Sequence, residues 1–245
     1  MRILAVIAGF GLFVSTLCAA ALPPEYETLK ANAEKLYAEG SFAKANELYA
    51  SATLTNLPPT EQRWVQFRLA DTQWRSEAAT KTADTSKLDA ARHQLEVLVR
   101  DVSQDEDKDR VWVEVQESLG DFFWIRQNRQ DWLAAWPHYQ QALEWWASAP
   151  DIELARQRYL ATVWRMAKPP GMPGRYEFSY WGNLVPLEIL DNAAKIAQSE
   201  NDQAHAHYLI AMTLRNQGGD PWQRARVPEE FEGAIKAGKS TDWYD

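Results

Sequence analysis

Apolar and small residues recur at steps of three and four along most of the chain, a spacing that places side chains on one face of an α-helix. The clearest stretch surrounds Gly40, where Leu29, Ala33 and Leu36 line one face of a predicted helix. Gly40 is expected to end this helix, because glycine readily adopts the left-handed turn that follows a helix C-terminus. A second helix is predicted to follow, with a facing stripe of Phe42, Ala45, Tyr49 and Ala52.

The alanines in this pattern have a packing role. Two helices cross closely only where one of the side chains between them is small. A helix–turn–helix unit of this kind, with a length of about 34 residues, is typical of the tetratricopeptide repeat. The segment therefore predicts two antiparallel helices that form one repeat.

Later segments keep the pattern of the second helix. Each is preceded by a stretch that predicts a partner helix, over residues 61–77, 111–126 and 205–217. The unit length varies, mostly through inserts between the two helices of a pair. The repeated positions are Leu88, Ala91, Leu95 and Leu98, then Trp132, Ala135, Tyr139 and Ala142, and finally Val227, Phe231 and Ala234.

Residues 151–199 fit the repeat least well. Helices are expected from 152 to about 168, capped by Asp151, and from 186 to about 198, opened by Pro186. The prolines and glycines of residues 169–174 exclude a helix between them, and the alternation that follows hints at a short extended piece. This loop carries the candidate binding residues, as either a structural plug or a contact surface for a partner protein: Tyr176, Phe178, Tyr180 and Trp181.

The predicted fold is all-α, a tetratricopeptide-like solenoid of about five helical hairpins over residues 22–245, one of which carries the long aromatic loop. Residues 241–245 look like the start of a further helix. A solenoid that ended there would expose an apolar face without a polar capping repeat. We therefore expect the chain to be truncated, or to continue into something further.

Composition agrees with a folded, water-soluble helical protein. Hydrophobic residues make up 46% of the 245 positions and charged residues 24%, which excludes disorder, a collagen-like chain and a disulfide scaffold. Only 11 glycines and 12 prolines are present, and such sparse punctuation suits long helices better than many short strands.

The first 21 residues read as a secretory signal peptide. Arg2 supplies the positive start, an apolar stretch follows, and Ala19–Ala21 forms a small-residue cleavage site. The alternative is an uncleaved signal anchor, although the apolar stretch is short for a membrane span of about 20 residues. Cleavage would remove Cys18, the only cysteine, and leave a thiol-free protein in the periplasm or outside the cell.

The charge balance restricts the partners. The formal net charge is −8, and no cluster of Lys and Arg interrupts this acidic background. Nucleic acids and anionic membranes are therefore excluded as partners, since binding them depends on concentrated positive charge. Protein is the expected partner. The densest charged run, Asp105–Asp109, is expected to be a solvated linker whose negative charge favours the start of the next helix.

Little in the sequence points to catalysis, and we expect no catalytic residues, no bound metal and no cofactor. His205 and His207 lie on opposite sides of a predicted helix, so they cannot share a metal ion. No His-x-x-x-His, Cys-x-x-Cys or Gly-x-Ser-x-Gly spacing occurs. Carboxylates are abundant, but no spacing indicates that any two converge in a cleft, so we expect them on the solvated surface.

The 12 tryptophans are expected mainly to pack between helices, as at Trp64, Trp74, Trp112, Trp124 and Trp164. Adjacent residues diverge by about 100° around a helix. Trp145 and Trp146 therefore cannot both face the same core.

Four runs resemble the N-terminal helical region of large secreted bacterial proteins of the alpha-2-macroglobulin-like family: Arg63–Arg75, Val115–Trp124, Ala135–Trp146 and Ala204–Arg215. That family traps proteases with a bait region and, in many members, a Cys-Gln thioester. Because Cys18 is the only cysteine, this chain has no thioester. The resemblance thus implies that endopeptidase inhibition, if it occurs, resides in sequence beyond Asp245.

The sequence therefore predicts a non-catalytic, exported scaffold whose curved surface binds a protein, either a separate partner or the remainder of its own polypeptide. The alternative hypothesis is an exported glycan-binding or glycan-processing helical protein, prompted by the tryptophans, the acidic residues and the export signal.

Overall fold

The computed structural model describes residues 22–80, 84–126, 130–167, 185–217 and 220–239. All regular structure within these ranges is helical, which confirms the all-α prediction. The α-helices are α1 (Pro24–Ala38), α2 (Phe42–Ala50), α3 (Pro59–Ala78), α4 (Thr85–Arg100), α5 (Arg110–Trp124), α6 (Trp132–Ser148), α7 (Ile152–Ala167), α8 (Leu187–Ile196), α9 (Glu200–Gln217) and α10 (Pro221–Gly238), with short 3₁₀ turns at Leu54–Asn56 and Asp105–Asp107.

Several helices begin at an aspartate whose carboxylate accepts a hydrogen bond from an otherwise unpaired backbone N–H. Asp109 caps α5 by accepting from the N–H of Trp112 at 2.8 Å, as expected from the charged run before it. Asp151 caps α7 by accepting from the N–H of Leu154 at 3.1 Å, again as predicted. The other aspartate caps are Asp84 of α4, Asp131 of α6 and Asp220 of α10.

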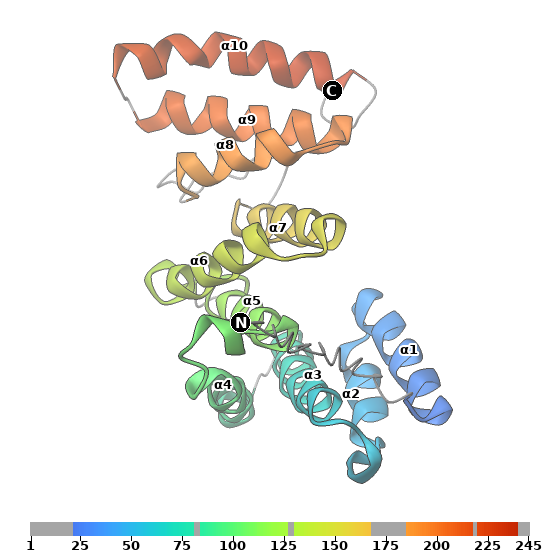
Figure 1. Ribbon diagram of the computed structural model, residues 1–245. Coiled ribbons are helices and arrows are strands. Elements are labelled where there is room, and N and C mark those ends of the chain that lie inside the picture. Colours follow the sequence, from blue (N-terminus) through green and yellow to red (C-terminus); the bar gives the residue numbers. More distant parts are fainter. Residues whose placement is uncertain (1–21, 81–83, 127–129, 168–184, 218–219, 240–245) are drawn as a thin grey trace, which may run out of the picture.

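Each helix packs against the next one along the chain, and α3, α5 and α7 also contact one another in that order (Figure 1). Trp164 of α7 reaches α9, where its ring stacks on His205 at a centroid distance of 4.2 Å and its Nε1–H donates to Asp202 at 3.0 Å.

The central helix, α5, is buried on all sides along nearly its whole length. Val115 and Leu119 pack into a core shared with α1, α3 and α4, whereas Trp112 and Val113 pack into a second core shared with α6, α7, α8 and α9. Successive side chains are about 100° apart around the axis of a helix. The two apolar faces of α5 therefore leave room for a third face, which carries buried polar residues.

Most of the positions predicted to pack between helices lie in the interior. Gly40 has a φ of 74° and ends α1 in a left-handed turn. Seven alanines and tyrosines of the repeated stripe are fully buried, namely Ala33, Ala45, Tyr49, Ala91, Ala135, Tyr139 and Ala142. Phe42 and Ala52 are only half-buried, because they lie at or beyond the ends of the short helix α2.

The predicted tryptophan packing is also found. Trp64, Trp74, Trp112 and Trp124 are buried, and Trp164 is half-buried. Trp146 is buried and Trp145 half-buried, as their divergence around α6 requires.

Some predictions lie outside the described residues. These are the signal peptide at 1–21, the aromatic set Tyr176, Phe178, Tyr180 and Trp181, and the helix start at 241–245. None of the helices in the described ranges combines the length and apolar character that crossing a bilayer requires.

Candidate functional site

Charged residues of alternating sign occupy matching positions on α3, α5 and α7. Arg75 of α3 and Asp121 of α5 are 46 residues apart, and Asp121 and Arg165 of α7 are 44 residues apart. The same separations relate Arg68, Glu114 and Arg158. On each helix the charged residues follow steps of three, four or seven, so they share one face. We call the nine residues of this array the charge ladder: Glu34, Arg68, Asp71, Arg75, Glu114, Glu117, Asp121, Arg158 and Arg165.

The charge ladder has two ends, and the first of these two edges, around Arg68 and Glu114, links four helices. Arg68 donates from Nε and Nη2 to the two carboxylate oxygens of Glu34 on α1, at 2.8 and 2.7 Å. Its Nη2 also lies 3.5 Å from Glu114 of α5. Arg158 of α7 approaches the same oxygen of Glu114 at 3.4 Å. A single carboxylate on the central helix is therefore shared by arginines from both neighbours.

The second edge repeats this arrangement. Arg75 donates to Asp121 at 2.7 Å and to Asp71 at 2.9 Å. Arg165 donates to Asp121 at 3.1 Å and to Glu117 at 2.7 Å. Arg158 meets Glu117 at 2.7 Å, which joins the two edges.

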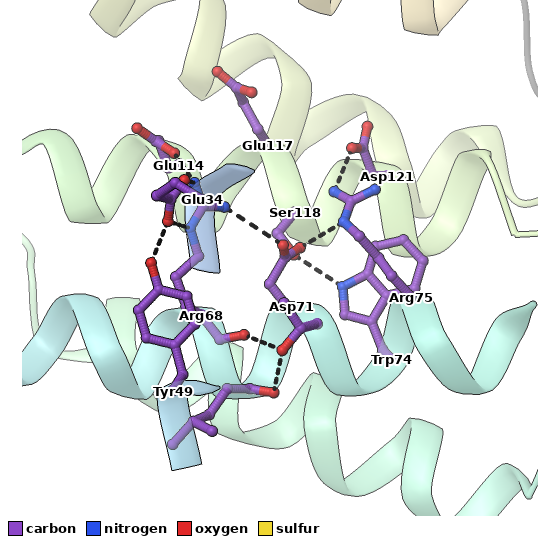
Figure 2. Close-up of polar contacts among 12 residues, drawn as sticks. Glu34, Tyr49, Arg68, Asp71, Trp74, Arg75, Glu114, Glu117, Ser118 and Asp121 are labelled. Carbon is purple, nitrogen blue, oxygen red and sulfur yellow. Dashed lines mark hydrogen bonds and ion pairs between the residues drawn. The ribbon is translucent and has the colours of Figure 1, made fainter. Parts of the chain in front are cut away.

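Uncharged side chains also donate hydrogen bonds to the carboxylates of the charge ladder, beside those that the arginines donate (Figure 2). Ser118 donates to Asp71 at 2.5 Å and accepts from the indole N–H of Trp74 at 3.0 Å. The hydroxyl of Tyr139 donates to Asp121 at 2.8 Å, and Tyr49 donates to Glu34. Trp146 donates to Glu117 at 2.6 Å. Residues predicted only to pack between helices thus also hold the buried charges in place.

The ion pairs of the charge ladder favour the ionised forms of Asp121 and Arg165. Burial alone raises the pKa of the Asp121 carboxyl, but the guanidinium groups of Arg165 and Arg75 outweigh it, and the pKa lies below its ordinary value. Burial alone lowers the pKa of the Arg165 guanidinium, but the carboxylates of Asp121 and Glu117 outweigh it, and the pKa lies above its ordinary value. The Asp121 carboxylate therefore holds no proton to donate near neutral pH, and its ion pairs join α3, α5 and α7.

The burial of these carboxylates contradicts the expectation that acidic residues lie on the solvated surface. Asp71, Glu114, Glu117 and Asp121 are at most 3% exposed. The expectation was wrong because it considered each carboxylate without its partner, and a buried charge is tolerated when an opposite charge and further hydrogen bonds satisfy it. A usable signal was present in the sequence: opposite charges recur at separations of 46 and 44 residues, on every second predicted helix.

His205 and His207 both lie on α9, where their rings contact different neighbours. His205 stacks on Trp164, and His207 is hydrogen-bonded through Nδ1 to Glu230 of α10 at 2.7 Å. No group of three or more potential metal ligands among His, Cys, Asp and Glu is found in the described part of the chain.

Surface pockets beside the second core include two of contrasting character. The first, which we call the α7–α8 groove, has a volume of about 380 Å³ and is lined mainly by apolar side chains from the end of α6, the start of α7 and the end of α8. The second, which we call the Trp112–Trp145 pocket, has a volume of about 290 Å³ and a mainly polar lining that includes Asp105, Gln141 and Glu144.

Comparisons with protein-family models, with curated proteins and with solved structures each find no match to this chain.

Proposed function

We propose that this chain is a non-catalytic protein-interaction module: a tetratricopeptide-like solenoid of helical pairs that binds a partner protein or the remainder of its own polypeptide. The observation that supports it is the charge ladder, in which opposite charges at matching positions of α3, α5 and α7 join every second helix in one register. A repeat array held in this way presents a stiff, extended surface, and stiffness reduces the entropy that is lost on docking.

The repeat spacing supports the solenoid part of the proposal. Asp121 stands 46 residues after Arg75 and 44 before Arg165. The same spacing relates Thr72, Ser118 and Thr162, which are all buried. A recurring position of this kind is expected of helical pairs stacked in series, each of which contacts its neighbours.

We further propose that the chain is exported and forms the N-terminal helical region of an alpha-2-macroglobulin-like protein. This proposal rests on the four resembling runs and on the signal-like residues 1–21. N-terminal sequencing of the protein recovered from the producing cells tests export, with Leu22 as the expected first residue. Recovery of an intact Met1 in the cytoplasm would contradict it.

The binding function is tested with the folded chain as bait. Chemical crosslinking and affinity capture are carried out against exported proteins and against the polypeptide encoded after Asp245, and each captured protein is then purified and mixed with the chain. We expect a complex of defined stoichiometry with a dissociation constant of about 1 μM or tighter, which a stable interface of ordinary size supplies. If neither source yields a complex with the purified components, the proposal is wrong.

A second candidate function, glycan binding, is favoured by the Trp112–Trp145 pocket. Asp105, Gln141 and Glu144 place hydrogen-bonding groups beside two indole rings, and polar groups beside aromatic rings are typical of small polar ligand sites. A glycan array with tryptophan fluorescence as a second readout tests this function. Saturable quenching that is lost in Glu144→Gln, but not in Glu47→Gln on the exposed face of α2, would support it.

A further inference from the structure

The charged side chains that line the α7–α8 groove are opposite in sign to the net charge of the chain. Its walls are largely apolar, with buried Trp146, Ala155 and Tyr159 beneath a rim that includes Ile152 and Ile196. The charged side chains among its described lining residues are both basic, Arg156 and Lys195. In a chain with a formal net charge of −8, a basic rim around an apolar groove marks a local preference for a negatively charged partner.

The rim is available for binding. Ile152 is 76% exposed, although it stands next to the buried floor of the groove, and Lys195 is also exposed. Arg156 pairs with Glu153 one turn earlier on the same helix, and Glu153 is not among the lining residues. Lys195 is therefore the cation that can meet an incoming carboxylate without first breaking an ion pair of this kind.

The size and chemistry of the groove fit one large side chain. A volume of about 380 Å³ lies within the range of ordinary ligand pockets, which begins near 300 Å³. Partner residues that fill such pockets at protein interfaces are most often aromatic, because a rigid ring buries a large area at a small cost in entropy. An acidic residue beside that ring would lie near Lys195.

We propose that the α7–α8 groove is the docking site for a segment of a partner protein that inserts one aromatic side chain flanked by acidic residues. This inference rests on the proposed protein-binding function and names the partner's chemistry.

The test measures binding of short fluorescent peptides to the full chain by fluorescence polarisation. One peptide carries a tryptophan between two aspartates in a serine–glycine background, and matched peptides replace the tryptophan by alanine or the aspartates by lysine. We expect the first peptide to bind at least about tenfold more tightly than either matched peptide, because each lacks one of the two complementary features.

Two groove variants and two controls locate the site. Lys195→Glu places a like charge beside the aspartates, and Ile152→Asp removes the exposed apolar rim; each is expected to weaken binding about tenfold. Lys236→Glu on α10 and Leu133→Asp on α6 make the same chemical changes at other exposed positions and are expected to bind like the unchanged chain. Circular dichroism of all four variants verifies that they remain folded.

The outcomes separate this inference from the proposed function. Equal binding of the three peptides, or groove variants that bind like the controls, would overturn the docking site. A captured partner that binds Lys195→Glu and Ile152→Asp with unchanged affinity would also overturn it, while leaving the protein-binding function intact. Self-association that the groove variants abolish would assign the groove to a second copy of this chain and overturn the proposed partner. If the tryptophan–aspartate peptide binds the groove but no partner protein is captured, the α7–α8 groove remains a binding site and the proposed protein-binding function is wrong.

Discussion

At the scale of single residues, Asp121 is a buried carboxylate that three side chains of the protein hold in place. It is 2% exposed and receives hydrogen bonds from Arg75, Arg165 and Tyr139. A buried ion pair adds little to stability by itself, because removing both charges from water costs about as much as their attraction returns. The loss of one partner is different, since it leaves the other charge buried and uncompensated.

We therefore expect Asp121→Asn to lower the free energy of unfolding by about 3 kcal/mol or more. Urea denaturation followed by circular dichroism measures the change. The control is Asp105→Asn, which removes a carboxylate of 90% side-chain exposure from a pair with Lys108 and should change stability by about 0.5 kcal/mol or less. A loss at Asp121 as small as that of the control would contradict the role assigned to it.

The Asp121 carboxylate also makes the free energy of unfolding depend on pH at acidic pH. The pKa of Asp121 is lower in the folded protein than its ordinary value of 3.8, so its contribution is fully present above that value and is lost as the pH falls through the lower folded pKa. We expect the stability difference between the unchanged chain and Asp121→Asn to stay constant from about pH 7 to about pH 5 and to shrink below about pH 4. A difference that grows on acidification would contradict this assignment.

At the scale of elements, α5 explains why this row of helices packs tightly. Its two apolar faces enter separate cores, and its acidic face is neutralised by α3 and α7. Close approach to α6 depends on Gly120, where an added Cβ would lie 2.7 Å from the ring of Tyr139. The pattern of the sequence predicted close helix–helix contacts at alanines, and it did not identify Gly120 as such a position.

Two glycine substitutions separate steric from conformational effects. Gly120→Ala is expected to lower the free energy of unfolding by about 1–3 kcal/mol through overpacking, even though alanine favours a helix. Gly40→Ala meets no atom within 4 Å, and its cost of about 1–2 kcal/mol arises from the positive φ alone. Thermal and urea unfolding measure both variants. A Gly120→Ala chain that is more stable than the unchanged one would show that Tyr139 moves aside freely.

At the scale of the whole molecule, the charge ladder connects α1, α3, α5 and α7, whereas α8, α9 and α10 lie outside it. Helices that contact only their neighbours along the chain can open separately, so a network across four helices is expected to couple their opening. The last three helices have their own smaller polar cluster, in which Arg226 joins Asp191 of α8 to Glu230 of α10, both at 2.8 Å.

Hydrogen exchange can test this coupling. Glu117 accepts from Arg158, Arg165 and Trp146, so Glu117→Gln is expected to reduce amide protection in α3, α5 and α7 together. The exchange of α10 is expected to remain unchanged, and the slowest exchange in the unchanged chain is expected in α5. A loss of protection confined to α5 would indicate that the helices open independently.

Much of the local structure is determined by the sequence alone. Asp109, Asp151 and Pro186 mark where α5, α7 and α8 start, and Gly40 marks where α1 ends, because caps and left-handed turns depend on a few neighbouring residues. The stripe of Ala33, Ala45, Ala91 and Ala135 likewise identifies the buried face, since the side-chain period of a helix is a local property.

Only the tertiary structure decided which charged side chains are buried and where the surface keeps a groove. The pattern of the sequence treats Asp71, Glu114, Glu117 and Asp121 as surface residues, because an isolated carboxylate is costly to bury. The burial of Glu114 and Asp121 becomes acceptable because arginines of both α3 and α7 reach them. Glu117 is paired with two arginines of α7, whereas Asp71 is paired within its own helix. The α7–α8 groove is likewise a product of stacking, since its walls come from the end of α6, the start of α7 and the end of α8. Periodicity describes one helix at a time, whereas pairing and concavity are properties of several helices placed together.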